Sequence, residues 1–455
     1  MPLKMNCQPW KKNFQMRINK YSSYKESKID WVGKIPSHWK IFRTTDLCYQ
    51  NKRKNIGTVE KNLLSLSYGN IIEKDFDTAF GLLPASFETY QIVKPGIIIL
   101  RLTDLQNDKK SVRVGLVKVR GIITSAYLGL VFNRKIHSAF MYYLLHSYDV
   151  LKVFYSQGGS MRQSMKFDDF KSIEIIIPPL EEQTAIAEYL DTKTQAIGKK
   201  VSLLEKKIGY YQELRKSLIN ETVTRGLDKN VKLKDNGIEL GDYHMISQIP
   251  EHWSTHRLDW ITTIVRGNTG FGKDELLDNG KYVALQYGKT YQVDEINNTF
   301  QYFVNSEFYK QTQIVNFGDT ILITTSETIE DLGHSCFYNR DELGLIGGEQ
   351  IILKPNPGVI FGKYLYYCSK EFRTKLRRNA TGLKVYRFNT DDLKQIFIAL
   401  PPLEEQIQIA DYLTNKIFKI DQIIKNIQTQ ITTLKELRKT LINDVVTGKI
   451  KVIND

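Results

Sequence analysis

The sequence predicts an α+β fold in which two mixed α/β domains are separated by two long helices that pair as an antiparallel coiled coil, with pseudo-two-fold symmetry. The motif Ile-Pro-Pro-Leu-Glu-Glu-Gln at 177–183 returns as Leu-Pro-Pro-Leu-Glu-Glu-Gln at 400–406, and each copy begins a long stretch with apolar residues at heptad spacing. A chain of 455 residues is also too long for one hydrophobic core, so at least two compact units are expected.

The composition is that of a soluble protein with a polyanionic partner. Hydrophobic residues make up 42% and charged residues 25% of the chain, and the formal net charge is +14. A basic surface concentrates phosphates near it, so nucleic acid is the first candidate partner. Residues 249–400 carry 17 basic and 18 acidic side chains, so this part needs a local basic patch to bind phosphate.

The cysteines and the N-terminus indicate a cytoplasmic protein that has no membrane contact. The four cysteines are far apart and form no Cys-x-x-Cys pair, which argues against a zinc ribbon and a disulfide framework. The N-terminus lacks the apolar region of a signal peptide, and no apolar run is long enough to span a bilayer.

The first half divides into three predicted parts. Residues 1–34 are a basic N-terminal extension, whose first 25 residues or so could be a mobile arm, a cap on the second helix or a piece of the first domain. Residues 35–180 form the first α/β domain, with short β-rich runs between turn residues, a late helix and a closing strand whose place in the sheet the sequence does not disclose. Residues 181–224 form the first coiled-coil helix.

The second half repeats this order. A linker at 225–248 leads to a second α/β domain at 249–403, a second helix at 404–447 and a tail at 448–455. Both domains begin with Ile-Pro-x-His-Trp, at 35–39 and 249–253, and between the shared landmarks their sequences differ almost everywhere. Shared motifs with divergent sequence between them are expected if two copies of one scaffold recognise two different targets.

Each helix has a narrow apolar seam, with prolines before it, glutamates in its first turn and a glycine after its end. The predicted seam positions are Leu190, Ile197, Leu204, Tyr211 and Leu218 in the first helix and Leu413, Ile420, Ile427, Leu434 and Leu441 in the second. A helix of about 44 residues is ~66 Å long, so parallel pairing would need the chain to return over that whole length, and antiparallel pairing needs no return. The alternative is an amphipathic helix packed on its own domain.

The duplicated helix starts, the Ile-Pro-x-His-Trp motifs and the order domain, helix, domain, helix resemble the specificity subunit of type I restriction-modification enzymes. The likeness covers nearly the whole chain. It implies that the two α/β domains are target recognition domains, each of which reads one half of a bipartite, asymmetric site in double-stranded DNA. It also implies that the helices fix the gap between the half-sites and dock two methyltransferase (modification) subunits, which restriction subunits join.

Catalytic motifs are missing from the sequence. Residues 266–274 approach a phosphate-binding loop, but Asp274 stands where a hydroxyl should bind magnesium, so a flexible or DNA-contacting loop is favoured. The Pro-Pro pairs lack the polar residue and the aromatic of an adenine methyltransferase tetrad. His38 and His252 have no metal ligands near them in the sequence and are interpreted as anchors of a domain edge. We therefore expect a non-catalytic chain that binds no metal or cofactor, with S-adenosylmethionine, ATP and magnesium on the partner subunits that the resemblance implies.

DNA contacts are expected from basic loops and from side chains able to read base edges. Arg162 and Gln163 suit guanine and adenine respectively, and the helix and loop at 363–387 form the basic patch of the second domain. The candidate contacts are Lys52, Arg53, Lys54, Arg101, Arg162, Gln163, Arg266, Lys289, Arg377, Arg378, Lys384, Tyr386 and Arg387. Further basic clusters comprise Lys109, Lys110, Arg113, Lys118 and Arg120, and Lys363, Lys370, Arg373 and Lys375.

Two other functions fit part of this pattern. A self-contained DNA modification enzyme would bind S-adenosylmethionine directly. A coiled-coil adaptor with lectin-like or protein-binding end domains is the other alternative, and duplex binding with the steep salt dependence that counterion release produces would argue against it.

Overall fold

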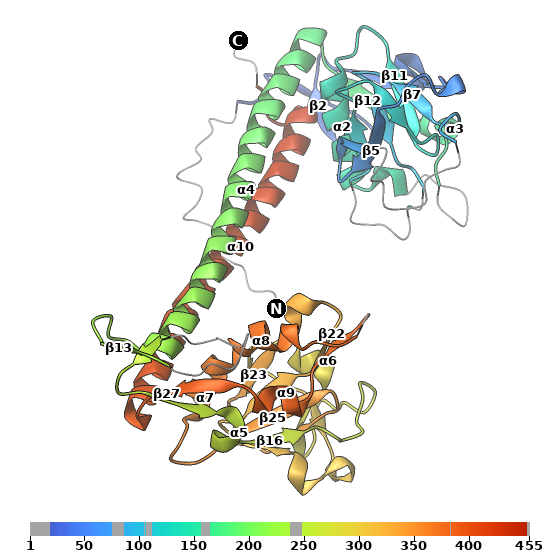
Figure 1. Ribbon diagram of the computed structural model, residues 1–455. Helices are drawn as coiled ribbons and strands as arrows, with labels where there is room; N and C mark the ends of the chain where they lie inside the picture. The colour runs from blue at the N-terminus through green and yellow to red at the C-terminus, as the bar shows by residue number, and fades with distance from the viewer. Residues whose placement is uncertain are drawn as a thin grey trace. The chain divides into compact units, whose positions relative to one another are not determined.

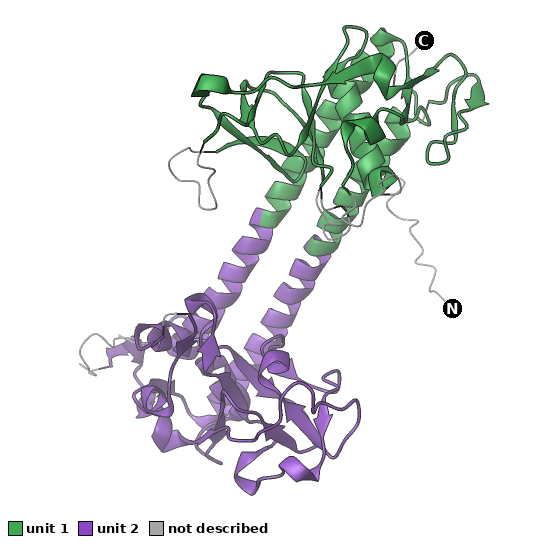
Figure 2. Cartoon of the chain, turned by 90° about the vertical axis from the view of Figure 1, so that its right-hand side faces the viewer, with its two compact units in different colours: residues 1–205, 428–455 green, residues 206–427 purple. Residues whose placement is uncertain are grey.

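The computed structural model describes residues 19–74, 86–103, 105, 112–155, 164–236, 248–382 and 384–452. The chain forms two compact units, shown in two colours in Figure 2: unit 1 comprises Met1–Glu205 and Gln428–Asp455, and unit 2 comprises Lys206–Ile427. Each unit therefore contains one α/β domain together with parts of both long helices.

The two long helices are α4 (Leu180–Arg225) and α10 (Leu403–Val446), labelled in Figure 1. Both begin directly after a Pro-Pro pair and carry two glutamates in the first turn, where the helix dipole favours negative charge. The glycines that follow, Gly226 and Gly448, have φ values of +77° and +73°, which ends each helix in a left-handed residue.

The helices pack antiparallel in each unit. In unit 1, Ile186 and Leu190 at the start of α4 share a core with Leu441 and Val445 at the end of α10. In unit 2, Ile219 and Val223 at the end of α4 share a core with residues at the start of α10, among them Ile409 and Leu413. The start of one helix thus lies beside the end of the other in both places, which confirms the predicted antiparallel coiled coil.

The predicted seam residues are buried or partly buried. Leu190, Leu413, Ile420, Ile427 and Leu441 are buried, and Ile197, Leu204, Tyr211, Leu218 and Leu434 are partly buried. The seam also includes charged positions that the apolar pattern did not predict, among them Arg215, three residues before Leu218.

The α/β domain of unit 1 contains two four-stranded sheets. Their strand orders are β6-β5-β10-β7, in which only β5 and β10 are parallel, and β4-β11-β8-β9, which is antiparallel throughout. The bounds are β1 Tyr24–Glu26, β2 Lys34–Pro36, β3 Lys40–Arg43, α1 Thr44–Leu47, β4 Cys48–Gln50, β5 Leu63–Ser67, β6 Asn70–Lys74, β7 Gln91–Val93, β8 Ile98–Leu100, β9 Val114–Leu116, β10 Gly121–Ile123, β11 Leu128–Phe132, α2 Ser138–Val150, α3 Phe167–Phe170 and β12 Glu174–Ile177.

The α/β domain of unit 2 repeats this topology. Its sheets have the orders β19-β17-β24-β20, in which only β17 and β24 are parallel, and β16-β25-β21-β23-β18, in which β18 is an added fifth strand. The bounds are β13 Leu233–Asp235, β14 Gln248–Pro250, β15 Ser254–Arg257, α5 Leu258–Ile261, β16 Thr262–Arg266, β17 Tyr282–Leu285, α6 Tyr287–Thr290, β18 Glu295–Ile296, β19 Phe303–Val304, β20 Ile314–Val315, β21 Thr320–Ile323, β22 Thr325–Ser326, β23 Ser335–Tyr338, β24 Gly344–Ile346, β25 Gln350–Pro355, α7 Gly362–Ser369, α8 Phe372–Arg378, β26 Tyr386–Arg387, α9 Thr390–Lys394 and β27 Phe397–Leu400.

The segment predicted as an N-terminal extension is, from Asn19 on, part of unit 1. Strand β1 pairs with β2, Tyr21 is buried in the unit 1 core, and the Tyr24 hydroxyl donates to the carbonyl of Gly448 just after α10. Of the three roles left open by the sequence, the described residues of this segment take two, a piece of the first unit and a cover on the end of α10. The linker repeats the arrangement, because β13 pairs with β14 as β1 does with β2.

Candidate nucleic-acid interface

Each long helix is fastened to its domain by the two motifs that the sequence repeats. In unit 1 the Glu182 carboxylate accepts hydrogen bonds from Trp39 Nε1 at 3.0 Å and from the Tyr21 hydroxyl at 3.0 Å, and it lies 2.5 Å from His38 Nε2. The indole of Trp39 is fully buried, so its N–H needs this partner. The Ile-Pro-x-His-Trp motif and the Leu-Glu-Glu-Gln motif therefore form one joint.

Unit 2 contains the same joint with one contact fewer. Trp253 Nε1 donates to Glu405 Oε2 at 3.1 Å, and His252 Nε2 lies 2.9 Å from the same oxygen. No tyrosine of the described chain donates to Glu405. The interpretation of His38 and His252 as anchors of a domain edge is confirmed by these contacts, and no cluster of metal-ligating side chains occurs among the residues that the structure describes.

The glutamine of each motif joins a second helix to the long one. Gln183 Oε1 accepts from the backbone N–H of His137, the residue before α2, while its Nε2 donates to the carbonyl of Pro178 at 3.0 Å. Gln406 makes the matching bonds to Phe361 N, before α7, and to the carbonyl of Pro401. One buried amide thus satisfies an otherwise unpaired helix N-terminus and the turn that precedes the long helix.

The candidate DNA contacts of unit 1 are only partly visible. Lys52, Arg53 and Lys54 are exposed in the loop after β4, and Arg101 is half-buried just after β8. Arg162, Gln163, Lys109 and Lys110 lie outside the described residues.

One basic cluster of unit 1 was wrongly interpreted as a single surface. Arg113 is buried, and its guanidinium donates to the carbonyls of Arg101 and Thr103 and to the Tyr155 hydroxyl. Lys118 and Arg120 are exposed, and Arg120 is paired with Glu60 at 2.8 Å. Arg113 supports the loop after β8 from inside, so it is removed from the candidate surface.

The basic patch of unit 2 divides into buried and exposed cations. Lys375 is buried and donates to the carbonyl of Gln395, Lys363 pairs with Glu295 at 2.6 Å, and Lys370 pairs with Asp294 at 2.7 Å. The prediction that these three lysines belong to a DNA-facing surface was wrong, because each is bonded to a partner within the domain. Nothing in the sequence indicated these contacts, since the partners lie 20 or more residues away.

The exposed cations of this basic patch cluster around one short ribbon. Strand β26 pairs with β22. The backbones of Thr381 and Arg387 also exchange two hydrogen bonds, each N–H donating to the other residue's carbonyl. Arg378, Lys384 and Arg387 are exposed here, Tyr386 is half-buried, and the half-buried Arg377 donates to the carbonyl of Glu330. We call Arg378, Lys384, Tyr386 and Arg387 the β26 ribbon; it is the exposed part of the predicted patch.

The remaining candidates lie on the loops of the two sheets. Arg266 is exposed at the end of β16, and Lys289 of α6 lies with its Nζ 4.5 Å from the centroid of the Tyr302 ring. After the segment 266–274 the next helix is α6, which begins at Tyr287. The segment therefore does not lead into a helix, as a phosphate-binding loop would.

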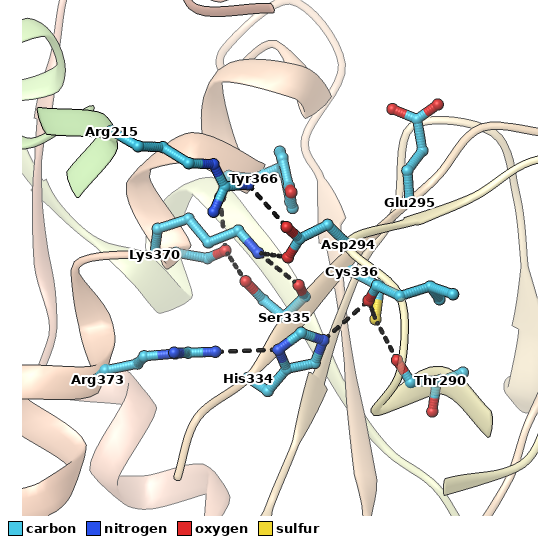
Figure 3. A network of polar contacts seen from close by, with 12 residues as sticks. Arg215, Thr290, Asp294, Glu295, His334, Ser335, Cys336, Tyr366, Lys370 and Arg373 are labelled. Atoms are coloured by element: carbon cyan, nitrogen blue, oxygen red, sulfur yellow. Dashed lines mark hydrogen bonds and ion pairs between the residues drawn. The ribbon is translucent and has the colours of Figure 1, made fainter. Parts of the chain in front are cut away.

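Sequence reasoning missed a polar network inside unit 2, drawn in Figure 3. Asp294 accepts from both Arg215 of α4 and Lys370, the residue after α7, and these two cations hold the pKa of its carboxyl far below the usual range against the opposing effect of burial. His334 lies beside them, and burial lowers the pKa of its imidazole to about 4. The only signal in the sequence was the charged Arg215 at a seam position.

Residues 36–204 and 250–433 match the family model described as the type I restriction modification DNA specificity domain. These residues are more than half of the chain. The chain belongs to this family of type I restriction-modification DNA specificity proteins.

Two relatives of this specificity protein are themselves described as specificity subunits. It is 23% identical to the putative type I restriction enzyme MjaX specificity subunit of Methanocaldococcus jannaschii over 96% of this chain and 99% of that protein. It is 26% identical to the MjaVIII specificity subunit of the same organism over 63% of this chain and 64% of that protein. A solved chain from a study of complex assembly and conformational transition of the type I restriction-modification system shares the fold, with a TM-score of 0.67, 16% identity and coverage of 90% of this chain and 98% of that chain.

The family assignment concerns the domains, and the individual contact residues stay predictions. Within the described part of this specificity protein, no helix is both long enough and apolar enough to cross a bilayer. Its predicted DNA contacts come from several loops of the two sheets and from the β26 ribbon.

Proposed function

We propose that this chain is the non-catalytic, DNA-reading subunit of a type I restriction-modification complex. Each α/β domain reads one half of a bipartite, asymmetric site in double-stranded DNA. The observation that carries the proposal is the repeated joint and sheet topology around unlike loops. A repeated scaffold with two different surfaces suits a site made of two different half-sequences.

The charge of the chain supports duplex binding. The net charge is +14, and in the nearly neutral second domain the exposed cations of the β26 ribbon provide a local patch. Each phosphate contact that a lysine or arginine makes lowers the salt exponent of binding by about 0.9. Replacing Lys384 and Arg387 by glutamine should therefore reduce the slope of log affinity against log salt by roughly 2, and an unchanged slope would remove the ribbon from the interface.

The outer face of α4 supports docking of the methyltransferase subunits. Tyr210 and Leu214 are 75% and 51% exposed, and Leu203 lies two turns before Tyr210 on the same helix, 58% exposed. The outer face of a two-helix coiled coil is normally polar, and exposed apolar groups of this size are typical of protein interfaces. We propose that modification subunits pack on these helices and that restriction subunits join them for cleavage.

The chemistry is assigned to the partners. S-adenosylmethionine, ATP and magnesium bind the modification and restriction subunits, and this chain binds no cofactor. Calorimetry of the purified chain with S-adenosylmethionine should give no binding heat. Measurable binding, or methylation of DNA by the chain alone, would make it a self-contained modification enzyme instead.

Assembly and spacing test the proposal as a whole. The purified chain mixed with its modification subunit should form a complex with two modification subunits per chain, measured by native mass spectrometry. We further propose that α4 and α10 set the gap between the half-sites. One heptad inserted into both helices should lengthen the preferred spacer, and an unchanged site would refute the spacing role.

A further inference from the structure

The network of Figure 3 connects the coiled coil of unit 2 to the loop before strand β18. Asp294, the residue before β18, accepts from Arg215 Nη2 of α4 through Oδ2 at 2.7 Å and through Oδ1 at 2.7 Å from Nζ of Lys370, the residue after α7. Lys370 also donates to the carbonyl of Ser335 at 2.7 Å. One carboxylate therefore ties a long helix, a domain helix and the edge of the sheet together.

The same loop is held by further contacts. His334 Nε2 lies 2.9 Å from the carbonyl of Val293, and its Nδ1 lies 2.9 Å from Arg373 Nη2. Because a guanidinium can only donate, Nδ1 accepts and the ring is neutral with its proton on Nε2. The thiol of Cys336 donates to the carbonyl of Thr290 at 3.1 Å. Residues 290–295, which connect α6 with β18, are thus fixed from the sheet and from two helices.

Arg215 is an unusual choice for its position. It takes a seam position between Tyr211 and Leu218, where an apolar residue packs best. Its side chain is 25% exposed, and its Nε also lies 3.7 Å from Asp421 of α10. A charge in a seam costs packing energy, and its well-attested use is to select one arrangement over others, because hydrogen bonds to a guanidinium are directional.

The matching position in unit 1 lacks this pairing. Arg438 of α10 occupies the same place in the repeated Glu-Leu-Arg-Lys motif, and within the described residues it has no ion-pair partner. His146 of α2 stands near it, also with its Nδ1 unpartnered. Arg438 therefore serves as a matched control for Arg215.

We infer that Arg215 and Asp294 are positioning residues that fix how the second α/β domain is seated on α4, and thereby set the spacer length that the chain accepts. This inference rests on the proposed reading of a bipartite site. Arg215 and Asp294 then affect which spacer length is accepted, and the exposed loops determine which bases are preferred, since neither of the two side chains belongs to the β26 ribbon.

The test uses Arg215→Met in the full chain assembled with its modification subunits. This variant keeps an unbranched chain similar to the aliphatic part of Arg215 and leaves Asp294 paired with Lys370, so it removes the two ion pairs of Arg215, to Asp294 and to Asp421 of α10. Binding is measured on duplexes that carry the preferred half-sites with spacers one base pair shorter and longer. Wild type should bind the duplex with one spacer length most tightly. In R215M the ratio of its affinities for that duplex and for the shorter or longer ones should fall about tenfold, the scale of one charge-assisted hydrogen bond. Base preference in each half-site should not change, and R438M should behave as wild type.

A distance measurement separates failure of this inference from failure of the proposed function. Spin labels at Ser217→Cys on α4 and Asn298→Cys in the loop after β18, both exposed, report the seating within unit 2 in a Cys7→Ser background. R215M should broaden the distance distribution, R215K should restore part of it, and R438M should leave it narrow. A narrow distribution in R215M overturns the inference whatever the DNA result. A broad distribution together with a wild type that has no spacer preference overturns the bipartite reading and retains the positioning role.

Discussion

Units 1 and 2 share their joints and their sheet topology, but differ in what they add to them. Both have a buried tryptophan bonded to a glutamate of a long helix, and both place a parallel strand pair at the centre of one sheet. Among the described residues, unit 2 has in addition strand β18, the pairing of β22 with β26, and helix α8. The repeated sequence motifs therefore form the contacts between each long helix and its domain, and the divergent segments form the loops and the additional strands.

The joint itself also differs between the units. Unit 1 adds the Tyr21 hydroxyl to Glu182, whereas unit 2 adds a partly buried charge network around Asp294. A neutral hydroxyl adds a bond at little desolvation cost, whereas charges that are partly removed from water need partners of opposite charge. In unit 1, α2 makes further contacts to the long helices, from Tyr143 to Asp191 and from Ser147 to Asn443, so the charge network is what distinguishes unit 2.

The largest expected effect tests the shared joint. Trp39→Ala and Trp253→Ala each remove a fully buried indole, and each should lower the free energy of unfolding of its own unit by about 3–5 kcal/mol. Denaturant unfolding followed by hydrogen exchange in each unit measures this. Trp260, 66% exposed, provides the control, since W260A should change stability by less than about 0.5 kcal/mol. A small effect of one of the two core variants would mean that the joints are not equivalent.

The next effect concerns pH, and both units should show it. Burial lowers the pKa of His146 in unit 1 and of His334 in unit 2 to about 4 from 6.5. Since the folded pKa lies below the unfolded value, the stabilisation is complete above pH 6.5 and is lost as pH falls toward 4. Between pH 7 and 5 each histidine should cost its unit about 2 kcal/mol. H146Q should flatten the pH dependence of unit 1 alone, and an unaltered slope would contradict the assignment.

A smaller effect sharpens the difference between the joints. Glu182→Gln weakens contacts to Trp39, Tyr21 and His38, and should cost about 2 kcal/mol because hydrogen bonds to a charged group are strong. Glu405→Gln weakens only the contacts to Trp253 and His252 and should cost about 1 kcal/mol. The difference should vanish in a Tyr21→Phe background, measured by the same unfolding experiment. Equal costs in the wild-type background would show that the tyrosine adds nothing.

The smallest effect comes from the surface of the coiled coil. Lys435 Nζ lies 3.4 Å from Glu205, and both side chains are more than half exposed. An exposed pair of this kind is worth less than about 0.5 kcal/mol, so E205Q should leave the thermal midpoint of unit 1 nearly unchanged. A large drop would mean that this pair has a role in the helix pairing that its exposure does not suggest.

The helices and their pairing could be predicted from the sequence because heptad spacing and helix-end signals are local. The seam at Leu190 and Leu413 and the antiparallel direction are confirmed. Surface charge could not be predicted as well. Arg113 and Lys370 looked exposed because their partners, the carbonyl of Arg101 after β8 and the carboxylate of Asp294, come from neighbouring elements that only the fold brings near.

The central claim is that each α/β domain reads its own half of a split site, and a binding selection tests it most directly. The full chain, assembled with its modification subunits, is offered a pool of randomised duplexes, and the bound fraction is sequenced. We predict two unlike sequence blocks at one fixed separation. A single continuous block, or two blocks whose separation varies freely, would contradict the account.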